Sequence, residues 1–435
     1  MIDIKERIKY LKLLKKWITN NRERIYKSLF SDLNKSNLES EISEISPVIH
    51  EINLYLKNIK KWAKRKRVKK PIHYIGSNFY KQAFPYGKAL LITPWNYPIN
   101  ISLISFINAF GAGNEVLLKP SKFSVNSSSL LKEIANEVFE NNYLKVFLGE
   151  KEISIKLLEE KIDIIFFTGN SAVGKNIYKK AAEKMIPCIL ELGGKSPVIV
   201  DESANIEKTA KRIIFGKMLN AGQTCVAPDY VYVHKSIKRK LVSALNLQYK
   251  NIYGLNSLNN RYLPKIISEN HFDRIKKFNL PINYNENRQI EFYIHESNLK
   301  DKIMQEEIFA PILPILEFNN LNEVIDNINN NYKSPLALYI FSKNNKNIEQ
   351  IINNIQSGGV GINDTILQIA NNNLGFGGVG NSGIGRYHGK DGFESFSQIR
   401  NIVKTNNKWD LNIRYKYLGN EKKKIKKIIK LTKSN

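Results

Sequence analysis

The stretch Ile162–Gly174, IDIIFFTGNSAVG, carries the strongest local signal for the fold of this chain. Its first part, Ile162–Thr168, is an apolar run of strand length, and a helical pattern opens directly after it. Gly169 and Gly174 let a backbone approach a pyrophosphate at the N-terminus of that helix. The complete G-x-G-x-x-G fingerprint is absent, so this stretch alone indicates an α/β unit and not yet a function.

The same alternation of strand-like and helix-like patterns continues on both sides of this stretch. Short apolar runs alternate with helical patterns, which implies a parallel sheet with helices on both faces. The predicted strands are Ala89–Thr93, Glu115–Lys119, Lys145–Leu148, Ile186–Leu190, Pro197–Val200, Tyr230–His234, Pro311–Phe318, Leu336–Phe341 and Gly359–Asn363. The later runs suggest a second α/β lobe. From Ile4 to Lys60 apolar residues recur at helical spacing, which predicts two or three amphipathic helices.

The formal net charge of +27 raises the question of a nucleic-acid partner. The basic residues are spread along the whole chain together with many Ile and Asn, the residues that AT-rich codons encode. Codon bias therefore accounts for the charge, and we predict no specific nucleic-acid partner. The basic run Lys61–Lys70 fits either a nucleic-acid patch or a solvated connector, and its place before the aromatic stretch His73–Phe84 favours the connector.

The two cysteines, Cys188 and Cys225, are too few for a disulfide framework, and neither they nor the six histidines show metal-ligand spacing. We therefore predict no metal. The charged N-terminus does not resemble a signal peptide, and no apolar run reaches the length of a membrane span. A cytoplasmic protein is the expectation.

Three polar residues stand where predicted elements end and loops begin. Cys225 lies in NAGQTC after a helical pattern at Ile206–Leu219, where a thiolate is a candidate nucleophile. Glu191 closes an apolar strand pattern before two glycines, so its carboxylate is a candidate base for water. Asn96, in the proline-bounded loop TPWNYP, offers amide N–H groups to an oxyanion.

Each of these three residues also has an ordinary structural explanation. A single cysteine is commonly a small buried hydrophobe. A glutamate at the end of a strand is often solvated, and an asparagine between prolines often caps a turn. Taken one at a time, the three positions leave both interpretations open, and the combination of motifs has to decide.

That combination resembles the aldehyde dehydrogenase superfamily, and within it the class 3, fatty-aldehyde-type branch. The resemblance runs from about Pro85 to Arg400 and rests on many motifs in the family's order. They are PYG, PWNYP, KPS, FTGNSAVG, LELGGKSP, NAGQTC, EEIF, PLALY, LGFGGVGNSG, YHGK and FESF. The resemblance implies NAD(P)-dependent oxidation of an aldehyde, of medium or long aliphatic chain or aromatic, to its carboxylic acid.

The resemblance also assigns roles to individual residues. It makes Cys225 the nucleophile, Glu191 the general base, and Asn96 the oxyanion donor beside the backbone N–H of Cys225. The thiolate forms a thiohemiacetal that yields a thioester on loss of hydride, and water activated by Glu191 hydrolyses the thioester. The implied cofactor-binding residues are Lys119, Lys122, Thr168, Gly169, Ser171, Gly174, Gly193, Glu307 and Phe309.

Lys122 departs from the family pattern. Many members have a glutamate there that accepts hydrogen bonds from the adenosine ribose, whereas a lysine eases the repulsion felt by a 2′-phosphate. We therefore expect NAD or NADP as cofactor, with NADP tolerated and even preferred. The alternative is that Lys122 points into solvent. The segment Leu280–Lys300 is Asn-rich and matches the family poorly, which leaves substrate preference open.

The implied fold is α/β: a Rossmann-like cofactor-binding domain, an α/β catalytic domain and a small β oligomerisation arm. The predicted ranges are 1–72 for N-terminal helices packing on the cofactor domain, 85–191 for that domain, 192–373 for the catalytic domain, 73–84 with 399–416 for the arm, and 417–435 for a basic tail. The resemblance implies a homodimer.

Three points stay open on the sequence alone. The tail carries Ile425, Ile428 and Ile429 on one helical face among lysines, which fits weak contact with an anionic membrane, although a frayed basic tail is favoured. A CoA-acylating dehydrogenase would share the cysteine, and Glu191 argues against it. A catalytically silent basic binding protein is the third reading, and the intact catalytic set argues against that.

Overall fold

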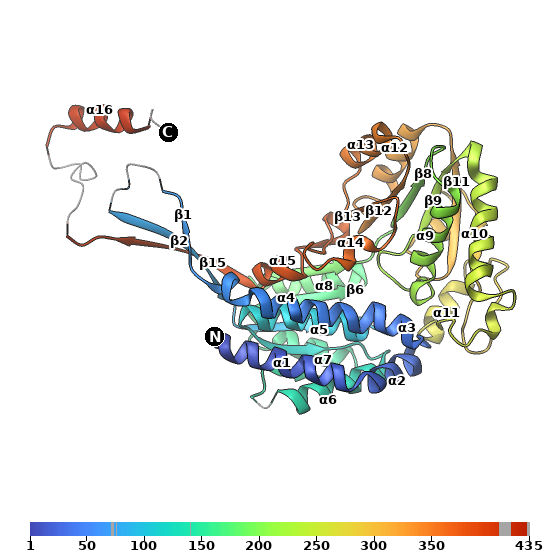
Figure 1. Cartoon of the computed structure of the whole chain (residues 1–435), viewed down its shortest axis with the longest axis horizontal. Coiled ribbons are helices and arrows are strands. Elements are labelled where there is room, and N and C mark those ends of the chain that lie inside the picture. The colour runs from blue at the N-terminus through green and yellow to red at the C-terminus, as the bar shows by residue number, and fades with distance from the viewer. Residues whose placement is uncertain (71–73, 75, 140, 409–418, 433–435) are drawn as a thin grey trace.

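The computed structural model describes residues 1–70, 74, 76–139, 141–408 and 419–432. These residues form two α/β lobes, each built on a six-stranded sheet, and a narrow three-stranded sheet that projects from the first lobe (Figure 1). The α/β architecture predicted from the alternating strand and helix patterns is confirmed.

The sheet of the first lobe has the strand order β14-β7-β6-β3-β4-β5. Its strands are β3 (Lys88–Ile92), β4 (Glu115–Lys119), β5 (Leu144–Val146), β6 (Ile164–Gly169), β7 (Cys188–Leu192) and β14 (Gly383–Ile384). The first five are parallel, as predicted, and β14 joins antiparallel to β7 with Gly383 opposite Glu191. Sequence reasoning did not foresee β14, because a two-residue strand has no periodicity to detect.

Alternating side chains of the first sheet divide its core into two layers. Ala89 and Leu91 of β3 belong to one core cluster, which includes residues of the N-terminal helices. Leu90, between them, belongs to another, which includes residues of the two helices on the opposite face. The helices of the first layer are α1 (Ile4–Asn20), α2 (Arg22–Leu33), α4 (Ser46–Ala63), α5 (Pro98–Ala112) and α6 (Val125–Val138), and those of the second are α7 (Lys151–Glu159) and α8 (Ser171–Glu183).

Helix α5 is the central helix of the first layer and is buried on all sides. Pro98 stands at its start, where the missing N–H costs no hydrogen bond, and Gly113 ends it with a left-handed φ of 107°. Before α4 the chain makes a short helix, α3 (Asn37–Ser40), and one π-helical turn at Glu41–Ile45. Helices α1 and α4 lie against α5, whereas α2 packs against α6 (Figure 1).

The sheet of the second lobe is parallel throughout, in the order β10-β11-β9-β8-β12-β13. Its strands are β8 (Pro197–Val200), β9 (Tyr230–His234), β10 (Tyr293–Glu296), β11 (Ile312–Phe318), β12 (Ala337–Phe341) and β13 (Gly359–Ile362), with helices α9 (Ile206–Met218), α10 (Lys238–Tyr253), α11 (Glu269–Lys276), α12 (Leu321–Asn331) and α13 (Asn345–Asn354). Strand β10 lies in the Asn-rich segment 280–300, where no strand was predicted.

The arm consists of β1 (Lys66–Val68), β2 (Ser77–Pro85) and β15 (Ser397–Thr405), all antiparallel. Strand β1 corrects the prediction of a connector at Lys61–Lys70. The end of that run is a strand because its backbone pairs with β2, while its basic side chains remain exposed. Residues 73, 75 and 409–416 of the predicted arm lie outside the described residues.

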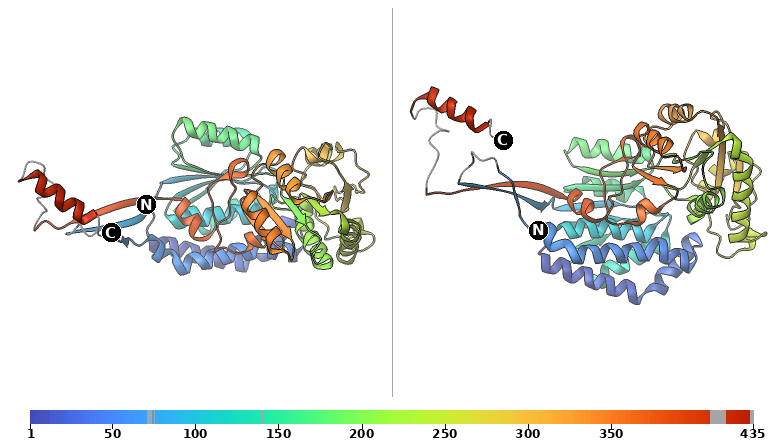
Figure 2. Two further views of the ribbon diagram at one scale, coloured as in Figure 1. Left: turned by 90° about the horizontal axis from the view of Figure 1, so that it is seen from above. Right: turned by 45° about the horizontal axis from the view of Figure 1, so that its top comes forward.

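After the arm, helix α16 (Glu421–Thr432) follows. The favoured prediction of a frayed tail is therefore wrong for these residues. Both views in Figure 2 show the arm and α16 extending away from the two lobes. Short helices α14 (Leu367–Ala370) and α15 (Gly389–Ser395) complete the C-terminal part. None of the helices in the described ranges has the length and apolar content of a membrane span.

Candidate active site

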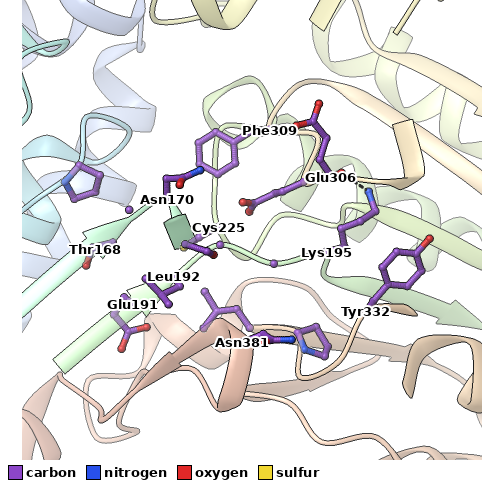
Figure 3. A pocket seen from close by; sticks show the side chains of 18 of the residues that line it. Thr168, Asn170, Glu191, Leu192, Lys195, Cys225, Glu306, Phe309, Tyr332 and Asn381 are labelled. Atoms are coloured by element: carbon purple, nitrogen blue, oxygen red, sulfur yellow. Dashed lines mark hydrogen bonds between the residues drawn. The ribbon is translucent and has the colours of Figure 1, made fainter. Parts of the chain in front are cut away.

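One cleft of about 520 Å³ brings together residues of both lobes. Its volume lies in the usual range of ligand sites. The predicted site residues that line it are Asn96, Thr168, Gly169, Ser171, Glu191, Gly193, Cys225, Glu307 and Phe309. Lys119, Lys122 and Gly174 do not line it. Figure 3 shows Cys225 in the middle of the view, among Thr168, Glu191 and Phe309.

Cys225 follows α9 through a strained turn. Asn220 and Ala221 both have left-handed backbones, with φ of 52° and 53°. Gly222 continues at φ 74°, and a Cβ there would lie 2.4 Å from the carbonyl oxygen of Ala310. Only glycine fits that close approach. The turn packs against the loop that carries Phe309, and this fixes where the thiol emerges.

The Cys225 thiol is partly buried and lies among negative charge. Burial and the nearby carboxylates of Glu307 and Glu191 raise its pKa well above the usual value. The backbone N–H groups of Cys225 and Val226 act in the opposite direction. The resting group is therefore a thiol, and it needs a base to become the thiolate nucleophile.

Glu191 is almost fully buried near the end of β7. Neither of its carboxylate oxygens has a hydrogen-bond partner of good geometry within the described residues. Burial raises its pKa well above the usual value, and Arg386 and the backbone N–H of Gly378 offset only part of that rise. A carboxylate with unused lone pairs and a raised pKa is suited to accept a proton from water.

Asn96 ties the TPWNYP loop to the cysteine loop. Its Nδ2 donates to the carbonyl of Gln223 at 3.1 Å, which leaves the second amide hydrogen of this group for a ligand in the cleft. A second hydrogen bond joins the same loops, because the Asn220 side-chain amide donates to the carbonyl of Asn96 at 2.9 Å. The predicted oxyanion donor and the loop of the predicted nucleophile are therefore held together.

A buried ion pair from the N-terminal helices supports the same loop. The Nζ of Lys35 lies 2.5 Å from a carboxylate oxygen of Glu44, and both side chains are completely buried. Lys35 also donates to the carbonyl of Asn96 at 2.8 Å. Glu44 accepts the backbone N–H groups of Ile99 and Asn100 in the first turn of α5. Sequence reasoning gave this region only a packing role.

The wall opposite the thiol suits a dinucleotide. Thr168 and Gly169 end β6, and Asn170 caps α8 by accepting the N–H groups of Ala172 and Val173. A Cβ on Gly193 would lie 2.2 Å from a carboxylate oxygen of Glu307, so glycine at this position leaves room for that carboxylate beside the backbone. The buried hydroxyl of Thr168 has no partner within the described residues. Open backbone beside a helix N-terminus fits a pyrophosphate and ribose.

Glu307 is half-buried beside the 193–194 backbone. Burial and the negative charge of Asp229 raise its pKa to about 8, while the N–H of Gly194 and Lys195 oppose that rise. Lys195 forms a buried ion pair with Asp229 at 2.5 Å. Lys195 and Asp229 were not singled out from the sequence, although Lys195 belongs to the quoted LELGGKSP motif.

The two lysines expected at the adenosine end behave differently from each other. Lys119 ends β4, is buried, and donates to the carbonyl of Pro120 at 2.9 Å. Burial lowers its pKa. Lys122 is exposed and forms an ion pair with Glu150, the residue before α7. The sequence alone placed Lys122 near a 2′-phosphate or in solvent, and the ion pair with Glu150 is a third arrangement.

A family model described as the aldehyde dehydrogenase family matches residues 1–402. The 4,4'-diaponeurosporen-aldehyde dehydrogenase of Staphylococcus aureus is 40% identical over 411 residues, covering 92% of this chain and 89% of the relative. The dimeric NADP-preferring aldehyde dehydrogenase of Rattus norvegicus is 39% identical, covering 91% and 89%. A Staphylococcus aureus AldH structure in its substrate-bound state has a TM-score of 0.95 at 38% identity, covering 99% and 95%.

Proposed function

Because the chain belongs to the aldehyde dehydrogenase family, in its class 3 branch, we propose that Cys225, Glu191 and Asn96 are the groups with which it oxidises an aldehyde. The chain is an NAD(P)-dependent aldehyde dehydrogenase that forms carboxylic acids. The observation that carries the assignment of roles is that these three side chains line one cleft with Gly193 and Glu307.

The chemistry begins at the sulfur. The Cys225 thiol passes its proton to solvent water, and the thiolate adds to the aldehyde carbon to form a C–S bond. The resulting oxyanion accepts hydrogen bonds from the Asn96 amide and the backbone N–H of Cys225. Bound NAD or NADP supplies the acceptor for the hydride that leaves the carbon. Two electrons leave with that hydride, and a thioester remains on the sulfur.

Glu191 completes the reaction. Its carboxylate takes a proton from water, the hydroxide adds to the thioester carbon, and the C–S bond breaks to release the acid and regenerate Cys225. The same carboxylate accounts for a hydrolytic outcome, because transfer to CoA requires no base for water. We therefore propose free acid as the product rather than acyl-CoA.

For substrate class, we propose medium- or long-chain aliphatic or aromatic aldehydes. The support is the class 3 likeness and the printed name of the Staphylococcus aureus relative, a 4,4'-diaponeurosporen-aldehyde dehydrogenase. The test is an aldehyde panel with each cofactor, followed by absorbance of the reduced nicotinamide and by detection of the acid. Cys225→Ala should abolish both signals. Acyl-CoA formation that depends on added CoA would establish the alternative reaction.

We further propose that residues 85–191 form the dinucleotide-binding domain and that residues 192–373 form the catalytic domain. We also propose that the protein is located in the cytoplasm. A homodimer formed through the arm is proposed from the arm itself and from a relative that is named as dimeric.

Weak membrane contact through α16 is proposed from its lysines and from Ile425, Ile428 and Ile429, each roughly half exposed. Such a helix can lie on an anionic lipid surface. Co-sedimentation with phosphatidylserine vesicles of the full chain and of a chain ending at residue 419 tests this, and equal binding by both would refute it.

A further inference from the structure

The loop Glu306–Phe309 is held by side chains at every carbonyl. Lys195 donates to the carbonyl of Glu306 at 2.8 Å. Arg274 donates to the next two, reaching Glu307 at 3.2 Å and also Ile308. His271 Nε2 lies 2.9 Å from the carbonyl of Phe309. Backbone carbonyls normally pair within secondary structure or with water, so side chains from elsewhere impose the shape of this loop.

Two of these side chains come from one face of α11. His271 and Arg274 are three residues apart and therefore adjacent on the helix. The Nε of Arg274 donates to Nδ1 of His271 at 3.3 Å. Nδ1 is then an acceptor, and the imidazole proton stays on Nε2, which donates to Phe309. Burial and the charge of Arg274 lower the pKa of His271 to about 4, so the ring is neutral at physiological pH.

The loop needs external support because its backbone is strained. Phe309 has a left-handed φ of 55°, which is unfavourable for a residue with a bulky side chain. Its ring centroid lies 5.6 Å from that of Trp95 and 6.1 Å from that of His271. His271 therefore holds both the carbonyl and the ring of Phe309. Loss of His271 would let this residue relax toward an ordinary conformation.

We propose that His271 and Arg274 are positioning residues that fix the Glu307 carboxylate and the Phe309 ring in the orientation needed to hold the nicotinamide end of the dinucleotide. This inference rests on the proposed function, in which Glu307 and Phe309 contact that end. Arg274 suits the role because its planar group offers several donors at fixed angles. A lysine keeps the charge but lacks that fork.

The decisive variant is Arg274→Lys, with Lys276→Met as a matched control on the same helix. Lys276 is exposed, forms an ion pair with Asp273, and lies over the Phe272 ring, away from the 306–309 loop. Three quantities are measured on each variant: NAD(P) affinity by calorimetry, NAD(P)H formation from an aldehyde, and hydrolysis of 4-nitrophenyl acetate. The ester can acylate Cys225 without a dinucleotide, so its hydrolysis reports Cys225 and its water-activating base Glu191 independently of the dinucleotide.

We expect Arg274→Lys to bind NAD(P) about fivefold more weakly, because the loop must now be ordered on binding. NAD(P)H formation should fall about tenfold to a hundredfold, since small misplacements of reacting groups carry costs of that size. Ester hydrolysis should stay within about twofold of the parent. Lys276→Met should match the parent in all three measurements.

His271 supplies a second test with a conservative rescue. His271→Leu should reproduce the Arg274→Lys pattern, and His271→Gln, whose amide can donate to the Phe309 carbonyl, should recover most of the lost dinucleotide affinity. The inference is overturned if Arg274→Lys behaves as the parent, or if ester hydrolysis and dinucleotide binding fall together. Failure of the proposed function looks different: the parent would bind NAD(P) but form no NAD(P)H from any aldehyde.

Discussion

At the scale of single residues, the site combines burial with carboxylates that have few partners. Glu191 has no hydrogen bond of good geometry within the described residues, Glu307 is half-buried at the edge of the cleft, and in both cases burial raises the pKa. Each carboxylate could in principle serve as the base for water. Glu191 is our assignment, because Glu307 is packed against the 193–194 backbone where the dinucleotide is expected.

Replacing the two carboxylates separates their roles. In Glu191→Gln the thioester should still form, so one equivalent of NAD(P)H appears rapidly, while the steady-state rate falls about a hundredfold or more for lack of a base. Glu307→Gln, the matched comparison, should lose the rapid phase instead, because it weakens the dinucleotide site. Rapid mixing with absorbance detection distinguishes the two. A normal steady-state rate in Glu191→Gln would transfer the role of base to Glu307.

The pH dependence of the parent follows from the raised pKa of Glu191. A base works only when ionised, and a pKa well above 4.5 keeps this carboxyl protonated to a higher pH than usual. The steady-state rate should therefore increase with pH, with a midpoint well above 4.5. A rate that is already flat from pH 5 upward would contradict the assignment.

The predicted preference between NAD and NADP depends on Lys122 and on its ion-pair partner Glu150. The ion pair between them is exposed, so it is worth little and is screened by salt. Glu150→Gln should free the lysine and raise kcat/KM for NADP relative to NAD about two- to fivefold, and Lys122→Glu should shift it the other way. Initial rates with both cofactors at low salt measure this ratio. An unchanged ratio in both variants would place Lys122 outside the cofactor site.

At the scale of elements, the segment Lys35–Ile45 is the least expected part of the site. Its π-helical turn places Glu44 over the start of α5, and Lys35 reaches the carbonyl of Asn96 from 61 positions away in the chain. Glu39 of the same segment accepts the N–H of Asn220 at 2.6 Å. The N-terminal helices therefore brace both the oxyanion loop and the cysteine loop.

Removing the lysine tests this bracing. Lys35→Met leaves Glu44 buried without its counter-ion, which should cost about 3–5 kcal/mol of unfolding free energy and lower activity. The double variant with Glu44→Gln should recover much of the stability, because no charge remains buried. It should not recover the activity, since the Asn96 carbonyl still lacks its donor. Denaturant unfolding measures the stability and kcat measures the activity. Lys12→Met, at an exposed position, is the control. If the double variant recovers stability and activity together, the Lys35–Glu44 ion pair has a purely structural role.

At the scale of the whole molecule, the arm is a projecting sheet that exposes apolar side chains on one face. Ile399 and Val403 lie on the same face of β15, and each is about half exposed, at 48% and 57%. Large apolar side chains exposed on a projecting sheet are typical of a protein interface. In the proposed homodimer this face is buried against the partner.

Charges on that face should disrupt the dimer. Ile399→Glu combined with Val403→Glu is expected to give a monomer in sedimentation equilibrium at concentrations where the parent is dimeric. Lys404→Glu, on the opposite face of the same strand, should leave the dimer intact. A dimer that survives the double change would move the interface elsewhere on the molecule.

Much of the fold was open to prediction because its signals are local. Ten strands were located from short apolar runs, and α9 was expected just before Cys225. The elements missed were those without a period of their own. Strand β10 lies in a polar, Asn-rich stretch, β1 is covered with basic side chains, and β14 has two residues. Such strands form because a neighbouring edge accepts them, which their own residues do not encode.

The sequence by itself determined the α/β class, the family and the identity of Cys225, Glu191 and Asn96 as candidates, because residue type and short-range spacing are enough for each. Only the tertiary structure decided what surrounds them. The pairing of Lys122 with Glu150, the bracing by Lys35 and the hold of His271 and Arg274 on the 306–309 loop all join distant parts of the chain. The physical reason is that a side chain's charge state and reach depend on burial and on neighbours, and both arise only when the chain has folded.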